Sequence, residues 1–154
     1  MAVRDDGRMD TNRRLTPALI AALVVGLVLA AVFGPRAYDK DILSYEFSGD
    51  PGDRAEVLDR AVRADFGFIV GYTLVLGALA LMLRSRARTE RIHRIASAFV
   101  VMTVAAAMCD YVEDAALLQH NGTWSAPFAA VKFLMIVPVV IGIPVLWIVN
   151  RRRS

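Results

Sequence analysis

Ionisable side chains inside long apolar segments are the feature of this sequence that could do chemistry. Asp65 opens one such segment, Asp110, Glu113 and Asp114 lie within the next, and Lys132 lies near the start of another. A charge at the centre of a membrane span costs roughly 2.5–3.5 kcal/mol, so charged residues there are rare and usually face a bundle interior or a functional pathway. These five residues, called the polar cluster below, are therefore the candidate site.

The spacing of the acidic residues predicts that they act together. Asp110 is three residues from Glu113 and four from Asp114, which places all three on one face of a helix. Counting along each segment puts the whole polar cluster at one depth, toward the outer side of the membrane. Four carboxylates then meet one ammonium, and Arg63 at the interface adds one positive charge at most. The excess negative charge needs protons, a bound cation or a cationic ligand unless water reaches the site, and the simplest prediction is a hydrated, outward-facing acidic pocket.

A salt bridge without further function is the alternative interpretation of the polar cluster. In that case Lys132 pairs with Glu113 or Asp110 and fixes helix packing, while Asp65 and Asp114 reach the lipid headgroups. We favour the functional interpretation, in which a ligand or a proton binds among these side chains. The sequence assigns no catalytic role to any of them.

Other reactive residue types are too few for a metal or nucleophile site. The only histidines are His93 and His120, in different loops, and Cys109 is the only cysteine. Intramembrane zinc hydrolases need more imidazoles, and the sequence contains neither HExxH nor GxSxG. We therefore predict no metal, no cofactor and no cysteine framework, and an enzyme is not the favoured class.

Four apolar segments must position the polar cluster. The chain of 154 residues is 56% hydrophobic, above the roughly 45–50% typical of soluble domains, and its charges gather between these segments. The predicted spans are about 15–34, 65–83, 95–118 and 127–149, and each is long enough to cross a bilayer of ~30 Å. We expect a single domain over 1–154, an all-α four-helix transmembrane bundle. A cleaved signal peptide is the alternative for the first span, although its apolar run exceeds the usual 7–15 residues.

The distribution of basic residues predicts the orientation. Four basic residues precede the first span, five lie in Arg84–Arg94 and three in Arg151–Arg153. The segment 35–64 holds five basic but seven acidic residues, and 119–126 holds neither kind. The positive-inside rule predicts that both termini are cytoplasmic, and we expect the protein in the inner or plasma membrane. The net charge of +3 comes from these flanking clusters, so nucleic acid is not an expected partner.

Local motifs predict how the helices begin, pack and bend. Asp50-Pro51 has the pattern of a helix N-terminus and predicts an amphipathic extracytoplasmic helix over about 51–64 that runs into the second span. Gly67 and Gly71 form a GxxxG pair, which favours packing within the bundle, with a homo-oligomer or protein partner through this face or the outer helix as the alternative. Pro138, Gly142 and Pro144 predict a kinked fourth span.

Several stretches together show a resemblance to known proteins. The stretches are YEF at 45–47, DFGFIVGY at 65–72, CDYVEDAALL at 109–118 and VKF at 131–133. In this order they resemble a group of small, uncharacterised four-span prokaryotic membrane proteins whose third span carries a D-x-x-E-N pattern. Asp110 and Glu113 match that pattern, whereas Asp114 stands in place of the asparagine and adds a charge. The resemblance implies the topology and the choice of polar residues, but no substrate.

Three functions are compatible with these observations. We favour binding or transport of an ion, a proton or a small or lipidic ligand at the polar cluster. A structural or accessory membrane subunit is the first alternative, in which the basic loops or the outer helix contact partner proteins or anionic lipids. A lipid-acting enzyme of the outer leaflet, with Glu113 or Asp110 as general acid or base, is the second.

Overall fold

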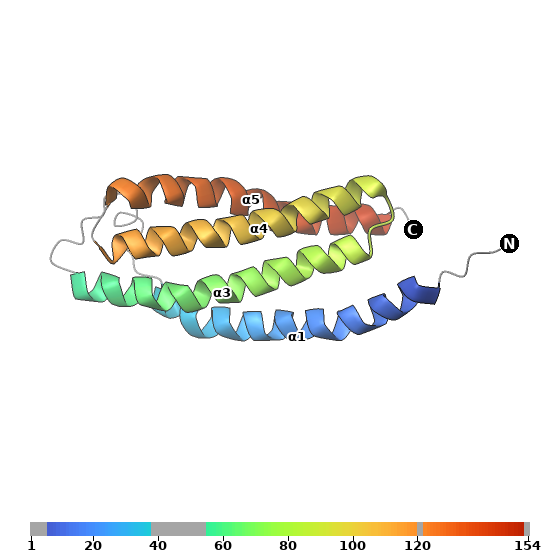
Figure 1. Cartoon of the computed structure of the whole chain (residues 1–154), viewed down its shortest axis with the longest axis horizontal. Helices are drawn as coiled ribbons and strands as arrows, with labels where there is room; N and C mark the ends of the chain where they lie inside the picture. Colours follow the sequence, from blue (N-terminus) through green and yellow to red (C-terminus); the bar gives the residue numbers. More distant parts are fainter. Residues whose placement is uncertain (1–5, 38–54, 120–121, 153–154) are drawn as a thin grey trace.

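The chain folds into antiparallel helices joined by short or undescribed connections. A computed structural model describes residues 6–37, 55–119 and 122–152. Within these ranges it contains α1 (Asp6–Ala37), α3 (Ala55–Ser85), α4 (Glu90–Leu117) and α5 (Gly122–Arg152), and no strand. The predicted all-α four-helix fold is confirmed, with the start of α1, the α3–α4 turn and the end of α5 at the same end of the bundle (Figure 1).

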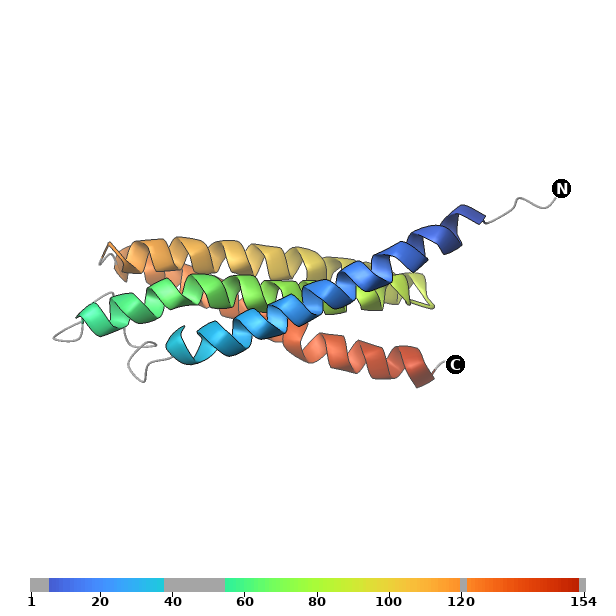
Figure 2. The same ribbon diagram turned by 90° about the horizontal axis from the view of Figure 1, so that it is seen from below.

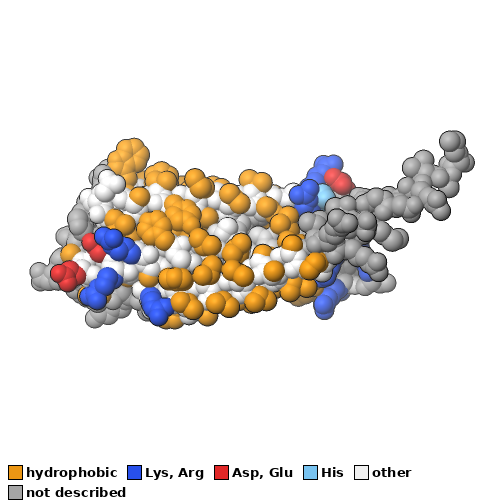
Figure 3. All heavy atoms as spheres, turned by 60° about the horizontal axis from the view of Figure 1, so that its bottom comes forward, with side chains coloured by type: hydrophobic (Ala, Val, Ile, Leu, Met, Phe, Trp, Pro, Cys, Tyr) orange, Lys and Arg blue, Asp and Glu red, His pale blue; other side chains and the backbone are white. Residues whose placement is uncertain are grey.

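All four helices are long and apolar enough to cross a membrane. The spanning stretches are Thr16–Ala37, Ala55–Ser85, Glu90–Leu117 and Trp124–Arg152. Large apolar side chains cover the middle of the outer surface, and several are at least half exposed, including Val24, Val101, Leu134 and Ile141. Figure 3 shows this apolar belt, with charged side chains gathered toward the two ends. A surface of this kind is stable only in lipid, so the chain is a multi-pass membrane protein.

Glycines allow α1 to pack closely against α3. A Cβ atom on Gly71 would lie 2.7 Å from the backbone nitrogen of Ala30, and one on Gly67 would lie 2.5 Å from the ring of Phe33. Gly26 of α1 makes the reciprocal approach, because a Cβ there would lie 2.7 Å from the carbonyl oxygen of Gly71. The GxxxG face is therefore occupied by a helix of the same chain, as small-residue packing in membranes requires.

The helices α3, α4 and α5 pack against one another around an apolar cluster. α3 contacts α4 and, to a lesser extent, α5, and α4 contacts α5, whereas the described part of α1 contacts α3 alone. Phe99, Val139 and Ile143 form a buried apolar cluster with Ala80. Gly142 makes room for Phe99, since a Cβ there would lie 2.3 Å from the ring.

The helix α5 contains prolines and changes direction along its length. α5 contains Pro127, Pro138 and Pro144 but is a continuous helix from Gly122 to Arg152. Its two halves run in different directions (Figure 2), as expected where proline removes a backbone hydrogen bond. The bend separates the half that carries Lys132 from the half that carries Trp147.

The predicted outer amphipathic helix is only partly within the described residues. From Ala55 onward this stretch is the first part of α3, continuous with the span that follows. Leu58 and Val62 are buried against Leu117 of α4, so this stretch packs on the bundle. The proposed start at Asp50-Pro51 lies outside the described residues, and a distinct surface helix remains a prediction.

Candidate functional site

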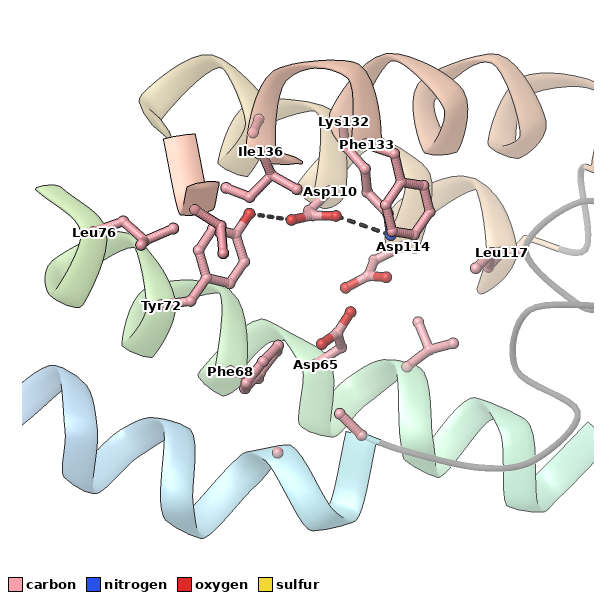
Figure 4. Close-up of a pocket in the computed structure, with 15 residues that line it drawn as sticks. Asp65, Phe68, Tyr72, Leu76, Asp110, Asp114, Leu117, Lys132, Phe133 and Ile136 are labelled. Carbon is pink, nitrogen blue, oxygen red and sulfur yellow. Dashed lines mark hydrogen bonds and ion pairs between the residues drawn. The ribbon is translucent and has the colours of Figure 1, made fainter. Parts of the chain in front are cut away.

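A cavity lies between the helices at the level of the polar cluster. It has a volume of about 430 Å³ and is lined by residues from all four helices. Figure 4 shows its polar side chains grouped in the middle, with apolar side chains around them. We call it the central cavity; its lining consists of Gly34, Ala37, Val62, Asp65, Phe68, Tyr72, Leu76, Ala106, Asp110, Asp114, Leu117, Lys132, Phe133, Ile136 and Val140.

Lys132 joins two carboxylates of α4 to α5. Its Nζ lies 3.0 Å from Oδ1 of Asp110 and 2.8 Å from Oε2 of Glu113. The side chains of the lysine, Asp110 and Glu113 are 11%, 8% and 0% exposed, so both ion pairs are buried. Buried charges of opposite sign at this distance hold each other in place strongly, because water does not screen them.

A third helix completes this network. The Tyr72 hydroxyl of α3 donates a hydrogen bond to Oδ2 of Asp110 (Figure 4). Asp110 therefore accepts from a phenol on one side and pairs with an ammonium on the other. The network of Tyr72, Asp110, Glu113 and Lys132 ties α3, α4 and α5 together, and all of its members except Glu113 line the central cavity.

Asp65 and Asp114 lie opposite each other beside this network. Asp65 comes from α3 and Asp114 from α4, and their carboxylates point toward each other in the cavity (Figure 4). Asp114 is only 3% exposed. Its Oδ2 atom is buried and has no hydrogen-bond partner within the part of the chain that the structure describes. Two carboxylates that face each other in a buried space require a positive charge or a proton between them.

The five predicted residues thus lie at one level of the bundle in two arrangements. Asp65, Asp110, Asp114 and Lys132 line the central cavity, while Glu113 lies behind its wall and contacts Lys132. The ion pairs of Lys132 with Asp110 and Glu113 are the contacts that the interpretation as a salt bridge without further function predicts. However, that alternative also expects Asp114 to reach the headgroups, and the burial of Asp114 does not fit this expectation. His120 lies outside the described residues.

Two contributors to the cavity were not predicted from the sequence. Tyr72 follows Asp65 by seven residues, which is two helical turns, and this spacing could have indicated that both face the same cavity. Phe68 lies between them on the same face and also lines the cavity. Tyr111, next to Asp110 in sequence, instead stacks on Phe66 with the ring centroids 5.6 Å apart.

Comparisons with known proteins add no family to this description. No protein-family model matches the chain, and no curated protein or solved structure is significantly similar to it. The resemblance to small four-span prokaryotic proteins therefore remains a prediction. The helices and their apolar surfaces establish the coarser description, that of a multi-pass membrane protein with four candidate spans.

Proposed function

We propose that this membrane protein binds a small organic cation with an apolar body in the central cavity. The observation that carries the proposal is the pair of Asp65 and Asp114, which face each other while a buried oxygen of Asp114 has no hydrogen-bond partner among the described residues. Lys132, the basic residue of the described cavity lining, contacts Asp110 and Glu113. A ligand ammonium beside Asp114 would donate to this buried oxygen and bring a positive charge between the two carboxylates.

The rest of the cavity favours an organic cation over a hydrated metal ion. Apart from the polar side chains, its walls are apolar, with Phe68, Leu76, Phe133, Ile136 and Val140 among them. A hard cation needs six or more oxygen ligands, and no group of three or more His, Cys, Asp or Glu side chains in the described residues is arranged to hold a metal ion. Aromatic faces, by contrast, attract ammonium groups and pack against their apolar substituents.

The arrangement of the helices supports access from the bilayer. α1 and α5 both contribute to the cavity lining, but their backbones do not approach each other closely within the described ranges. An amphiphile that partitions into lipid would meet the cavity between these helices. Binding of this kind is the step that transport, sensing and sequestration share.

Ligands of matched length test the proposal. Octylammonium, octanol and octanoate carry the same chain with a positive, neutral or negative head, and their binding to the purified protein can be followed by equilibrium dialysis in nanodiscs. We expect saturable binding of octylammonium alone. Asp114→Asn should weaken it at least tenfold, which is about 1.4 kcal/mol.

Glu56→Gln is the matched control, because it removes an exposed carboxylate of α3 outside the cavity. It should leave binding unchanged. If octanol bound as tightly as octylammonium, or if Asp114→Asn and Glu56→Gln behaved alike, the proposed ligand class would be wrong. Absence of binding together with lower stability of Asp114→Asn would favour the structural subunit, a role that the buried network around Lys132 supports.

A further inference from the structure

A second cavity lies at the other end of the bundle, where the α3–α4 turn meets the end of α5. It has a volume of about 300 Å³ and is lined by Leu83, Arg86, Arg88, Trp147, Asn150 and Arg151. We call it the arginine cavity. We propose that it binds the phosphate group of an anionic phospholipid.

The backbone around this cavity is held by one asparagine. Asn150 of α5 donates from Nδ2 to the carbonyl oxygen of Arg86 at 3.0 Å, and its Oδ1 accepts from the backbone N–H of Arg88 at 3.2 Å. These two hydrogen bonds fix the turn against α5. Thr89 then caps α4 by accepting from the backbone N–H of Ile92, so the turn is held on both sides. The two arginines of the turn therefore project from a positioned backbone.

The arginines that line the cavity suit an anionic ligand, which would bind in addition to the contacts that Arg88 and Arg151 make within the protein. Three guanidinium groups line it, and none of the described lining residues is acidic. Glu90, the acidic residue next to the turn, pairs with Arg94 at 2.9 Å on the exposed side of α4. Arginine presents several N–H donors in a planar fork that matches two phosphate oxygens, which makes it the side chain best suited to this group.

The surroundings favour a phosphate that belongs to a lipid. The guanidinium of Arg86 lies 5.7 Å from the ring centroid of Trp147, and indole rings concentrate at the membrane interface. Leu83, which is 1% exposed, closes the apolar side of the cavity. Val145 and Ile148 are half exposed on the adjoining surface of α5, where acyl chains would lie. Basic pockets between spans at this level bind acidic lipid headgroups.

Native mass spectrometry of the purified protein tests the proposal. The probes are phosphatidylglycerol, phosphatidylcholine and inorganic phosphate, each titrated into delipidated protein. We expect phosphatidylglycerol to bind at least tenfold more tightly than phosphatidylcholine and to resist competition by millimolar phosphate. Replacing Arg86 and Arg151 together by glutamine should remove this preference.

The matched control replaces Arg91 and Arg94 by glutamine, which removes the same charge from the exposed surface of α4 outside the cavity. This variant should keep the preference for phosphatidylglycerol. Equal loss in both double variants would overturn the proposal in favour of diffuse attraction, and full competition by inorganic phosphate would show that the ligand is soluble phosphate. Replacing Arg86 and Arg151 by lysine keeps charge and helix, and an affinity equal to that of the unchanged protein would refute the role of the guanidinium fork.

Discussion

Lys132→Met tests how far the buried ion pairs stabilise the bundle. The substitution keeps an unbranched side chain of similar length but removes the ammonium 3.0 Å from Asp110 and 2.8 Å from Glu113. Removing one partner of a buried pair costs about 3–5 kcal/mol, because the other charge stays buried. In membranes the unfolded chain also finds polar partners, which lowers such effects. We therefore expect a loss near the lower limit, about 3 kcal/mol in the free energy of unfolding.

A second substitution checks that reasoning. Adding Glu113→Gln removes one of the two stranded carboxylates and leaves Asp110, which still accepts from Tyr72. The double variant should recover about 1–2 kcal/mol, within the range of coupling found between residues in contact. Unfolding by dodecyl sulfate in mixed micelles, followed by circular dichroism, measures both values. A cost below about 1 kcal/mol for Lys132→Met, or a double variant less stable than the single one, would refute the account.

Two further predictions use the same unfolding assay. Gly71→Ala should cost about 1–3 kcal/mol, because its Cβ would lie 2.7 Å from backbone atoms of α1, whereas Gly77→Ala, with no neighbour within 4 Å, should be neutral or stabilise by up to about 1 kcal/mol. Equal effects of the two alanines would contradict the proposed close packing. Tyr72→Phe should cost about 1 kcal/mol through the lost hydrogen bond to Asp110, and no change would mean that the phenol does not hold that carboxylate.

The sequence was sufficient to predict the helices, because charge segregation and span length each point to them independently. The predicted first span, about 15–34, corresponds to the spanning stretch Thr16–Ala37. The helices themselves extend well beyond several predicted spans, as at Ala55 and Arg152. Hydropathy detects the part of a helix that lies in lipid, whereas the backbone continues into polar surroundings as long as its hydrogen bonds and caps allow.

The pairing within the polar cluster could not be predicted in the same way. Depth follows from counting residues, and so the sequence indicated that Asp110, Glu113 and Lys132 share a level. Which carboxylate contacts the lysine depends on the rotation of α4 and α5 about their axes, and that rotation is set by packing between helices, such as Phe99 against Gly142. For the same reason the sequence does not indicate that Tyr72 contacts Asp110, and it allows Asp114 to reach the headgroups, whereas the structure buries that side chain.

The free-energy cost of charged residues in lipid bears differently on the two parts of the polar cluster, the ion-paired network around Lys132 and the pair of Asp65 and Asp114. An ionised group at the centre of a span costs roughly 2.5–3.5 kcal/mol, so charged residues in spans are usually paired with one another or serve a function. Asp110, Glu113 and Lys132 fit that description, since each is paired within the bundle. Asp65 and Asp114 are two further acidic side chains beside this network, and a buried oxygen of Asp114 has no hydrogen-bond partner among the described residues. We therefore place the proposed cationic ligand at Asp65 and Asp114 rather than at the network around Lys132.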